Sequence, residues 1–543
     1  MAPTHGDEEI EGRYKERKAY KERSYAYSPV PASGGSTAVH DSTTLGKRFG
    51  ENGAGQTRLL GSNGVHVECP VNKMTEKGST KLQYIAAGAA NMASMAAGVM
   101  MGWTSPVLPQ LMKSVANTPL DKPITADDNT WIGSLVAIGA VIGCFVAGVL
   151  ADKIGRKYTL LSSTVLYLIG WALIASAGVV YQLYAARVVL GFGMAFAFTV
   201  VPMYCGEIAE ISVRGALGSF LQLFITIGLL YSYAIGPYVS YTAFWILCAI
   251  VPVVFFGCFV TMPESPYYLI KVNKKDQAIA ALARLRGKSE ASVQKEADEI
   301  QAELDEAARN EVSIVELFKN KVNLKATLYT SLLAAFQQLS GINVVLFYME
   351  TIFISAKSSL PTPIATIIVG VVQVLASGVT PVVVDRLGRK MLLIFSGVGE
   401  IVTLIALGIY FYMQDAQNLP VSDTIGMLPV VSLVIFIATY SVGWGPLPWT
   451  VMGEMLAANV KSKASSLAVC ACWLLAFFIT KFSSSLSSAF GNYTLYWVFA
   501  AFCVISVTFT IIVLPETKGK SLAQIQSELG GDSSADFESG RKM

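Results

Sequence analysis

Twelve apolar stretches, each long enough to cross a lipid bilayer as an α-helix, constrain this chain of 543 residues more than any other feature. They lie at about 82–103, 131–151, 158–177, 180–204, 216–236, 243–262, 325–354, 363–384, 391–413, 427–449, 464–487 and 493–514. The composition, 53% hydrophobic and 15% charged, is that of a membrane protein. The sequence therefore predicts twelve transmembrane helices.

A repeated motif divides these helices into two sets of six. Asp-Lys-Ile-Gly-Arg-Lys at 152–157 returns as Asp-Arg-Leu-Gly-Arg-Lys at 385–390, and Pro-Glu-Ser at 263–265 returns as Pro-Glu-Thr at 515–517. Two bundles of common descent, related by an axis normal to the membrane, explain such a repeat. We therefore predict an all-α membrane protein in which two six-helix bundles carry the twelve transmembrane helices.

The polar segments define the remaining organisation. Lys and Arg gather in alternate loops, so the positive-inside rule places both termini in the cytoplasm of a multi-pass protein, which we assign to the plasma membrane. Helical patterns at 274–286 and 289–309 predict short surface helices between the bundles. The predicted domains are a disordered cytoplasmic tail at 1–80, the first bundle at 81–262, a cytoplasmic linker at 263–324, the second bundle at 325–514 and a cytoplasmic C-terminal tail at 515–543.

Three carboxamides lie close together within the seventh apolar stretch, namely Gln337, Gln338 and Asn343. On a continuous helix these side chains and Ser340 would project from adjoining faces and line one side. Amides of this kind can simply bond one membrane helix to another. So many donors and acceptors at hydrocarbon depth instead favour a site for an uncharged, polyhydroxylated ligand, because each carboxamide both donates and accepts hydrogen bonds.

Charged residues at the predicted cytoplasmic helix ends form a second candidate set. In both repeats the glycine permits a tight turn, and the arginine can reach Glu207 or Glu454 on a neighbouring helix. Each glutamate is followed seven residues later by a basic residue. We interpret the set as a latch that holds the cytoplasmic ends together while the site faces outward; fixed loop geometry is the alternative. The set comprises Asp152, Arg156, Glu207, Arg214, Glu264, Asp385, Arg389, Glu454, Lys461 and Glu516.

The placement of ionisable residues argues against several kinds of protein. A formal net charge of +3 is too small to indicate a nucleic-acid partner. All three histidines precede the first apolar stretch, which excludes a histidine metal site in the membrane body, and we expect neither a metal nor a cofactor. The first stretch contains no Asp, Glu or His, which favours facilitated diffusion over proton symport.

Two further expectations concern the fourth and tenth stretches. Arg187 is the only basic residue inside the fourth stretch, and we expect it to pair with a carboxylate or to reach the membrane surface. Gly-Trp-Gly-Pro-Leu-Pro-Trp at 443–449 should break the tenth helix and form a hinge, because prolines remove backbone donors and glycines loosen the chain.

Five motifs along residues 82–525 connect this chain to a known family. They are the duplicated Asp-x-x-Gly-Arg-Lys, Pro-Glu-Ser-Pro at 263–266, Gln-Gln-Leu-Ser-Gly-Ile-Asn at 337–343, Gly-Pro-Leu-Pro-Trp at 445–449 and Pro-Glu-Thr-Lys-Gly at 515–519. With these motifs the chain resembles the sugar porter family of the major facilitator superfamily, in particular insect facilitated trehalose transporters and facilitative glucose transporters. The resemblance implies a transporter for a small neutral sugar, not an enzyme, in which a monomer suffices for transport.

By this resemblance six side chains would hold the sugar: Gln222 on helix five, Gln337, Gln338 and Asn343 on helix seven, Gln373 on helix eight and Trp449 on helix ten. For Trp449, a flat face against a sugar ring and anchoring at the membrane interface are both open.

Three positions depart from the family pattern. Tyr267 stands where Pro-Glu-Ser-Pro is usually followed by Arg, and Ser441 replaces a Glu before the glycine-proline break. Cys472 stands where many hexose transporters place a sugar-bonding Asn. The loss of one hydrogen bond to the sugar is worth about 1 kcal/mol, enough to alter sugar preference without abolishing transport.

The sequence thus predicts a facilitative uniporter that moves trehalose, glucose or both by alternating access. Two alternatives stay open at this point. One is a proton-coupled sugar symporter. The other is a sugar sensor with little transport, for which the 80-residue N-terminal segment is the supporting feature.

Overall fold

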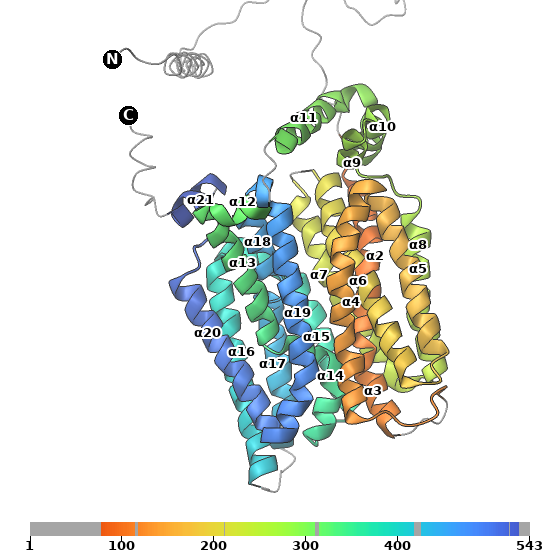
Figure 1. Cartoon of the computed structure of the whole chain (residues 1–543), viewed down its shortest axis with the longest axis vertical. Helices are drawn as coiled ribbons and strands as arrows, with labels where there is room; N and C mark the ends of the chain where they lie inside the picture. Colours follow the sequence, from red (N-terminus) through yellow and green to blue (C-terminus); the bar gives the residue numbers. More distant parts are fainter. Residues whose placement is uncertain are drawn as a thin grey trace, which may run out of the picture. The chain divides into compact units, whose positions relative to one another are not determined.

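The computed structural model describes residues 78–113, 118–210, 212–309, 314–417, 425–520 and 522–530, which form helices joined by short connections (Figure 1). Within these ranges twelve helical segments are long and apolar enough to cross a membrane, so the predicted number of spans is confirmed. Nearly all of the predicted N-terminal tail and the end of the C-terminal tail lie outside the described residues.

Six spanning segments form what we call the first half, residues 81–259. Their bounds are α2 (Lys81–Gly102) continued by α3 (Thr104–Lys113), α4 (Ala126–Lys153), α5 (Arg156–Ala175), α6 (Val180–Ile208), α7 (Arg214–Ile235) continued by η1 (Gly236–Tyr238), and α8 (Tyr241–Phe259). Buried alanines along α2, among them Ala86, Ala90, Ala93 and Ala97, allow α6, α7 and α8 to pack closely around it.

Six further spanning segments form the second half, residues 321–512. Their bounds are α13 (Lys321–Leu339) with α14 (Ile342–Ser355), α15 (Thr362–Leu387), α16 (Arg389–Phe411) with η2 (Tyr412–Ala416), η3 (Ile425–Met427) with α17 (Leu428–Val442) and α18 (Leu447–Met455), α19 (Ala458–Phe490) and α20 (Asn492–Ile512). Among these helices α16 packs against α17 and α20, and α13 packs against α19.

Short helices connect the halves and follow the last span: α9 (Pro266–Lys271), α10 (Lys275–Arg286), α11 (Glu290–Arg309), α12 (Ile314–Lys319) and α21 (Leu522–Gly530). The two predicted linker helices are confirmed as α10 and α11. They share a small apolar core that includes Leu282, Val293 and Ile300. Arg286 joins this core to the first half, because it binds Glu296 at 2.7 Å and the carbonyl oxygen of Ile208 at 2.7 Å.

Two interrupted spans bring backbone groups into the interior of the second half. The predicted break in the tenth helix is confirmed, since α17 ends at Val442 and α18 begins at Leu447. The prediction of a continuous helix through Gln337–Asn343 is wrong, because α13 ends at Leu339 and α14 begins at Ile342. Between them Gly341 has φ +81°, and a Cβ atom there would lie 2.3 Å from the ring of Phe499. Only glycine fits this turn without strain.

We call the end of the helices that carries the turns at 152–157 and 385–390 the motif end, and the other end the opposite end. In Figure 1, α9–α12 lie at the motif end, and α3 and α14 lie at the opposite end. The halves meet along α4 and α19, α7 and α15, and α3 and α14. At the opposite end Lys481 of α19 binds Asp127 of α4 and donates to Thr130 Oγ1 at 2.9 Å.

Candidate functional site

Gln338 is the centre of a buried amide cluster beside the break between α13 and α14. Its Oε1 accepts a hydrogen bond from Asn343 Nδ2 at 2.6 Å, so the two amides meet although the helix between them is interrupted. Its Nε2 donates to the sulfur of Cys472 at 3.1 Å. The sulfur of Cys472 on α19 thus takes up one donor of the Gln338 amide.

Gln337 faces a different set of groups. Its Nε2 donates to the carbonyl oxygens of Trp444 at 2.7 Å and Gly445 at 2.8 Å, both within the break between α17 and α18. These carbonyls have left the helical hydrogen-bond pattern, so the Gln337 amide supplies the donor that they need inside the membrane. In this conformation the Gln337 side chain therefore supplies a donor to backbone carbonyl groups. This is the structural role that the sequence allowed as the alternative to binding a ligand.

The other residues proposed from resemblance share no hydrogen bond with this cluster among the described residues. Gln373 on α15 is buried, and its Oε1 has no hydrogen-bond partner. Trp449 on α18 and Gln222 on α7 are partly exposed, and neither side chain forms a hydrogen bond among the described residues. Other buried polar atoms of the second half also lack a partner, among them Ser377 Oγ, Ser441 Oγ and Trp473 Nε1.

The charged candidate set forms two matching clusters at the motif end. In the first half Arg156 Nη2 binds Glu207 Oε1 at 2.8 Å, and in the second half Arg389 Nη2 binds Glu454 Oε1 at 2.8 Å. Arg156 also contacts Asp152 at 3.3 Å. Each ion pair therefore lies within one half and does not itself bridge the two halves. The side chain of Asp385 lies outside the described residues.

The two turns of the repeated motif have the same backbone geometry. Gly155 and Gly388 have φ +95° and +92°, as expected for tight turns that favour glycine. The backbone N–H groups that follow these glycines donate to Glu264 at the first turn and to Glu516 at the second turn, at 3.0–3.1 Å. A Cβ atom at Gly155 would lie 2.3 Å from the Glu264 carboxylate. The glutamates thus cap the helices that start at these turns.

The two capping glutamates differ in their pKa. For Glu264, burial raises the pKa above its usual value, and the backbone N–H groups of Ser265 and Lys157 only partly oppose this effect. For Glu516, burial also raises the pKa, but hydrogen bonds from four backbone N–H groups outweigh it, so the pKa lies below its usual value. Backbone donors therefore favour the charged form more strongly at Glu516 than at Glu264.

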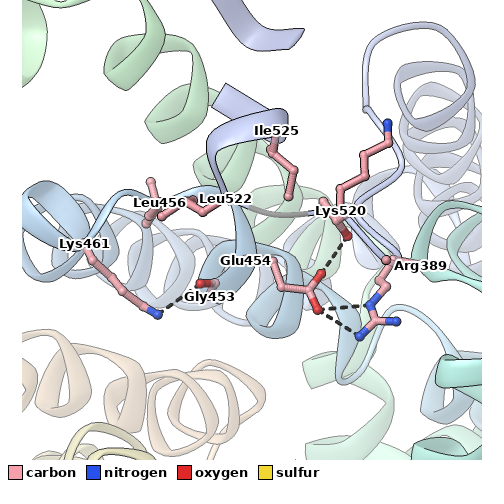
Figure 2. Close-up of a pocket in the computed structure, with 10 residues that line it drawn as sticks. Arg389, Gly453, Glu454, Leu456, Lys461, Lys520, Leu522 and Ile525 are labelled. Atoms are coloured by element: carbon pink, nitrogen blue, oxygen red, sulfur yellow. Dashed lines mark hydrogen bonds and ion pairs between the residues drawn. The ribbon is translucent and has the colours of Figure 1, made fainter. Parts of the chain in front are cut away.

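A pocket of about 360 Å³ opens beside the second cluster (Figure 2). Figure 2 shows Glu454 turned toward Arg389, while Lys461 points to the carbonyl group of Gly453, to which its Nζ donates at 3.0 Å. Arg214 is exposed and forms no ion pair with a carboxylate among the described residues. The structure therefore does not pair Arg214 and Lys461 with the glutamates seven residues before them.

Arg187 contradicts the expectation of a carboxylate partner or an escape to the surface. It is 0% exposed in α6, and its guanidinium donates to the carbonyl oxygens of Ile132 at 2.8 Å and Met100 at 2.9 Å. Close packing of α2, α4 and α6 leaves backbone carbonyls as the nearest acceptors. Neither α2 nor α3 contains a carboxylate that could pair with it.

Sequence reasoning missed three ionisable residues inside apolar stretches: Glu350 on α14, Glu400 on α16 and Lys481 on α19. A single charged residue within an apolar run was the available signal, because such residues are rarely kept without a function. It also missed the role of Tyr267, whose hydroxyl donates to Glu303 of α11 at 3.1 Å and so ties α9 to α11 within the linker.

The fold is that of a major facilitator superfamily transporter. The structure is similar to the E. coli xylose transporter XylE in a partially occluded inward open conformation, with a TM-score of 0.67 and 24% identity over 81% of this chain and 100% of that one. It is also similar to the proton:xylose symporter XylE bound to 6-bromo-6-deoxy-D-glucose, with a TM-score of 0.66 and 24% identity over 83% and 99% of the two chains. At this identity the likeness shows the fold alone.

The family model described as "Sugar (and other) transporter" matches residues 89–529, so the chain belongs to this family. It is 36% identical to the facilitated trehalose transporter Tret1 of Polypedilum vanderplanki over 85% of this chain and 93% of that protein. It is 35% identical to that of Bombyx mori over 85% and 89%. The Anopheles gambiae relative is also 35% identical, but this chain spans 59% of its length. These relatives are named as transporters, not enzymes.

Proposed function

We propose that the chain is a facilitative transporter that moves trehalose, glucose or both down a gradient by alternating access. Membership of the sugar transporter family supports the class of substrate. The names of the relatives, which are 34–36% identical, support trehalose. Buried amides and unpartnered hydroxyl groups suit a ligand whose hydroxyls both donate and accept hydrogen bonds.

The observation that carries the uniport mechanism is the environment of Arg187. This buried cation is held by backbone carbonyls, and the span that packs on it supplies no carboxylate. Among the described residues, α2 and α3 therefore supply no carboxyl group that could pair with Arg187 as a proton carrier, which supports uniport.

A second candidate function, proton-coupled symport, is supported by a different observation. Glu400 is 1% exposed within the membrane-spanning part of the second half, and Glu350 is partly buried in α14. Carboxyl groups inside membrane spans are frequent proton carriers. A sugar sensor with little transport would use the same binding residues without the flux.

For the site we propose that Gln222, Gln337, Gln338, Asn343, Gln373 and Trp449 contact the sugar. Because Gln337 Nε2 is engaged with the backbone here, the amide oxygen Oε1 is the atom that Gln337 would offer to the sugar. We propose further that the Arg–Glu clusters act as a latch at the motif end, that this end and both termini are cytoplasmic, and that the plasma membrane is the location. Residues 81–262 and 325–514 would then move as two domains joined by the linker at 263–324, with a monomer sufficient for transport.

Uptake into proteoliposomes tests this function. With labelled trehalose and glucose on the outside, uniport predicts that the internal concentration rises only to the external one, with or without an imposed proton gradient. Accumulation above the external concentration, driven by external acidity, would establish symport. Specific binding of sugar with no flux would establish the sensor and defeat the transporter.

A further inference from the structure

Glu400 is a buried carboxyl group without a basic partner. It lies in the middle of α16 and is 1% exposed. Its Oε1 accepts a hydrogen bond from Ser396 Oγ at 3.0 Å, and its Oε2 accepts one from Cys503 Sγ on α20 at 3.7 Å. No Lys or Arg pairs with it among the described residues. A carboxyl group at this depth is costly to bury, so a structural filler is a poor explanation for it.

Ser396 connects Glu400 to the break in the tenth helix. The hydroxyl oxygen of Ser396 accepts a hydrogen bond from the backbone N–H of Trp444 at 3.2 Å. The carbonyl oxygen of Trp444 accepts a hydrogen bond from Gln337 Nε2 at 2.7 Å. The backbone of Trp444 is thus held on its N–H side by Ser396 and on its carbonyl side by Gln337.

The direction of the Ser396 hydroxyl depends on Glu400. A serine hydroxyl has one proton to donate and lone pairs with which to accept. Because Glu400 accepts the proton, a lone pair of Ser396 is left to face Trp444. Without that acceptor the hydroxyl would donate to the backbone carbonyl four residues earlier in its own helix, which is the usual choice of a serine within a helix.

We propose that Glu400 is a positioning residue for Gln337, acting through Ser396 and the backbone of Trp444. By orienting Ser396 it holds the peptide groups of the break in place, and these peptide groups hold the Gln337 amide. Gly443 and Ser396 touch so closely that a Cβ atom at Gly443 would lie 2.3 Å from Ser396 Cβ, so a small rotation at Ser396 is transmitted to the break. The effect on sugar affinity rests on the proposed function, whereas the effect on the break does not.

The test uses five variants of the full-length protein, one of which is the double variant Glu400→Leu/Ser396→Ala. Glu400→Leu and Ser396→Ala each cut the chain of hydrogen bonds, while Glu400→Gln keeps the acceptor for Ser396. Thr403→Val is the matched control, because Thr403 lies on the same helix and bonds only to carbonyl groups of that helix. Hydrogen–deuterium exchange at the Trp444 amide is measured in all five, together with the half-saturation concentration and maximal rate of trehalose uptake.

We expect Trp444 exchange to be about fivefold faster in Glu400→Leu and in Ser396→Ala, the factor that corresponds to one lost hydrogen bond. The half-saturation concentration should rise by a similar factor at little cost to the maximal rate. The double variant should be no worse than either single one, because both interrupt one chain. Glu400→Gln should resemble the unaltered protein.

Exchange at Trp444 that is no faster than in Thr403→Val would overturn the proposal, and so would additive effects in the double variant. This readout requires no transport. If the unaltered protein shows no saturable uptake, the proposed function fails while the exchange result still decides the role of Glu400. Faster exchange with unchanged half-saturation would remove Gln337 from the sugar site and overturn the proposed effect on affinity.

Discussion

At the scale of single residues, Gln337 and Gln373 show two ways in which a buried amide can be accommodated. The Nε2 of Gln337 is bonded to two backbone carbonyls of the break between α17 and α18. The Oε1 of Gln373 has no partner although the residue is 1% exposed. An amide that satisfies the backbone stabilises the fold, whereas one with an unpartnered oxygen can give that oxygen to a ligand.

Replacing each glutamine with leucine should separate these roles. Gln337→Leu leaves two carbonyls without their donor and should lower the free energy of unfolding by about 2 kcal/mol. Gln373 Oε1 forms no hydrogen bond among the described residues, so Gln373→Leu should leave the free energy of unfolding nearly unchanged. The same substitution should raise the half-saturation concentration for sugar about fivefold. Thermal unfolding in detergent and uptake kinetics, normalised to the amount of protein at the membrane, check both. Equal thermal midpoints for the two variants would contradict the assignment.

At the scale of elements, the same capped turn is built twice with different electrostatics. Both turns place a glycine with positive φ before a helix, and both helices are capped by a glutamate from a later segment. Burial dominates at Glu264 and raises its pKa, whereas backbone donors dominate at Glu516 and lower its pKa.

Stability should therefore depend on pH in opposite directions at the two caps. A carboxyl group with a lowered pKa stabilises the fold above its unfolded value of 4.5, and this contribution is lost as the pH falls through its folded pKa. Glu264 has a raised pKa in the folded state, so as the pH rises above 4.5 its carboxyl group ionises first in the unfolded state. Its contribution to the stability of the fold therefore falls until the pH reaches its folded pKa.

Thermal midpoints of Glu264→Gln and Glu516→Gln across this range, each compared with the unaltered protein, provide the measurement. The stabilisation due to Glu516 should shrink on acidification, and that due to Glu264 should shrink on raising the pH above 4.5. Parallel pH profiles for the two differences would refute the contrast between the caps.

At the scale of the whole molecule, the contacts between the halves include a charged link at the opposite end. The Lys481 side chain is 11% exposed, binds Asp127 and Thr130, and lies 4.3 Å from the ring centre of Trp131. Tyr348 of α14 also donates to the Thr130 carbonyl at 3.5 Å. Any conformation in which the opposite end opens must break the contacts of Lys481, since they join α19 to α4.

Lys481→Gln and Asp127→Asn should therefore favour opening of this end. Ser134, which lies buried one turn beyond Thr130, provides the reporter as Ser134→Cys. In that background each variant should increase the labelling rate by a membrane-impermeant thiol reagent about tenfold, the effect of losing one partly buried charge pair. Lys481→Arg should label slowly, because it keeps the charge.

The matched control is Lys295→Gln, which removes a lysine from an exposed surface pair with Glu299. Exposed pairs of this kind contribute little to stability. Labelling in Asp127→Asn that is no faster than in this control would show that the pair does not hold the end closed.

The sequence by itself determined the number of spans, the linker helices, the glycine turns and the break in the tenth helix. These features depend on consecutive residues, through the run of apolar side chains that a bilayer requires and the backbone limits of glycine and proline. The proximity of Gln338 and Asn343 was likewise predictable from their spacing, although the helix between them is interrupted.

Only the tertiary structure decided which partners the buried polar groups take. Gln337 bonds to a break about one hundred residues away in the chain, at Trp444 and Gly445. Arg187 bonds to carbonyl groups of α2 and α4 where a carboxylate was expected. The physical reason is that inside the membrane each donor must find an acceptor on whichever helix packs beside it, and that neighbour is set by the packing of all the helices rather than by local sequence.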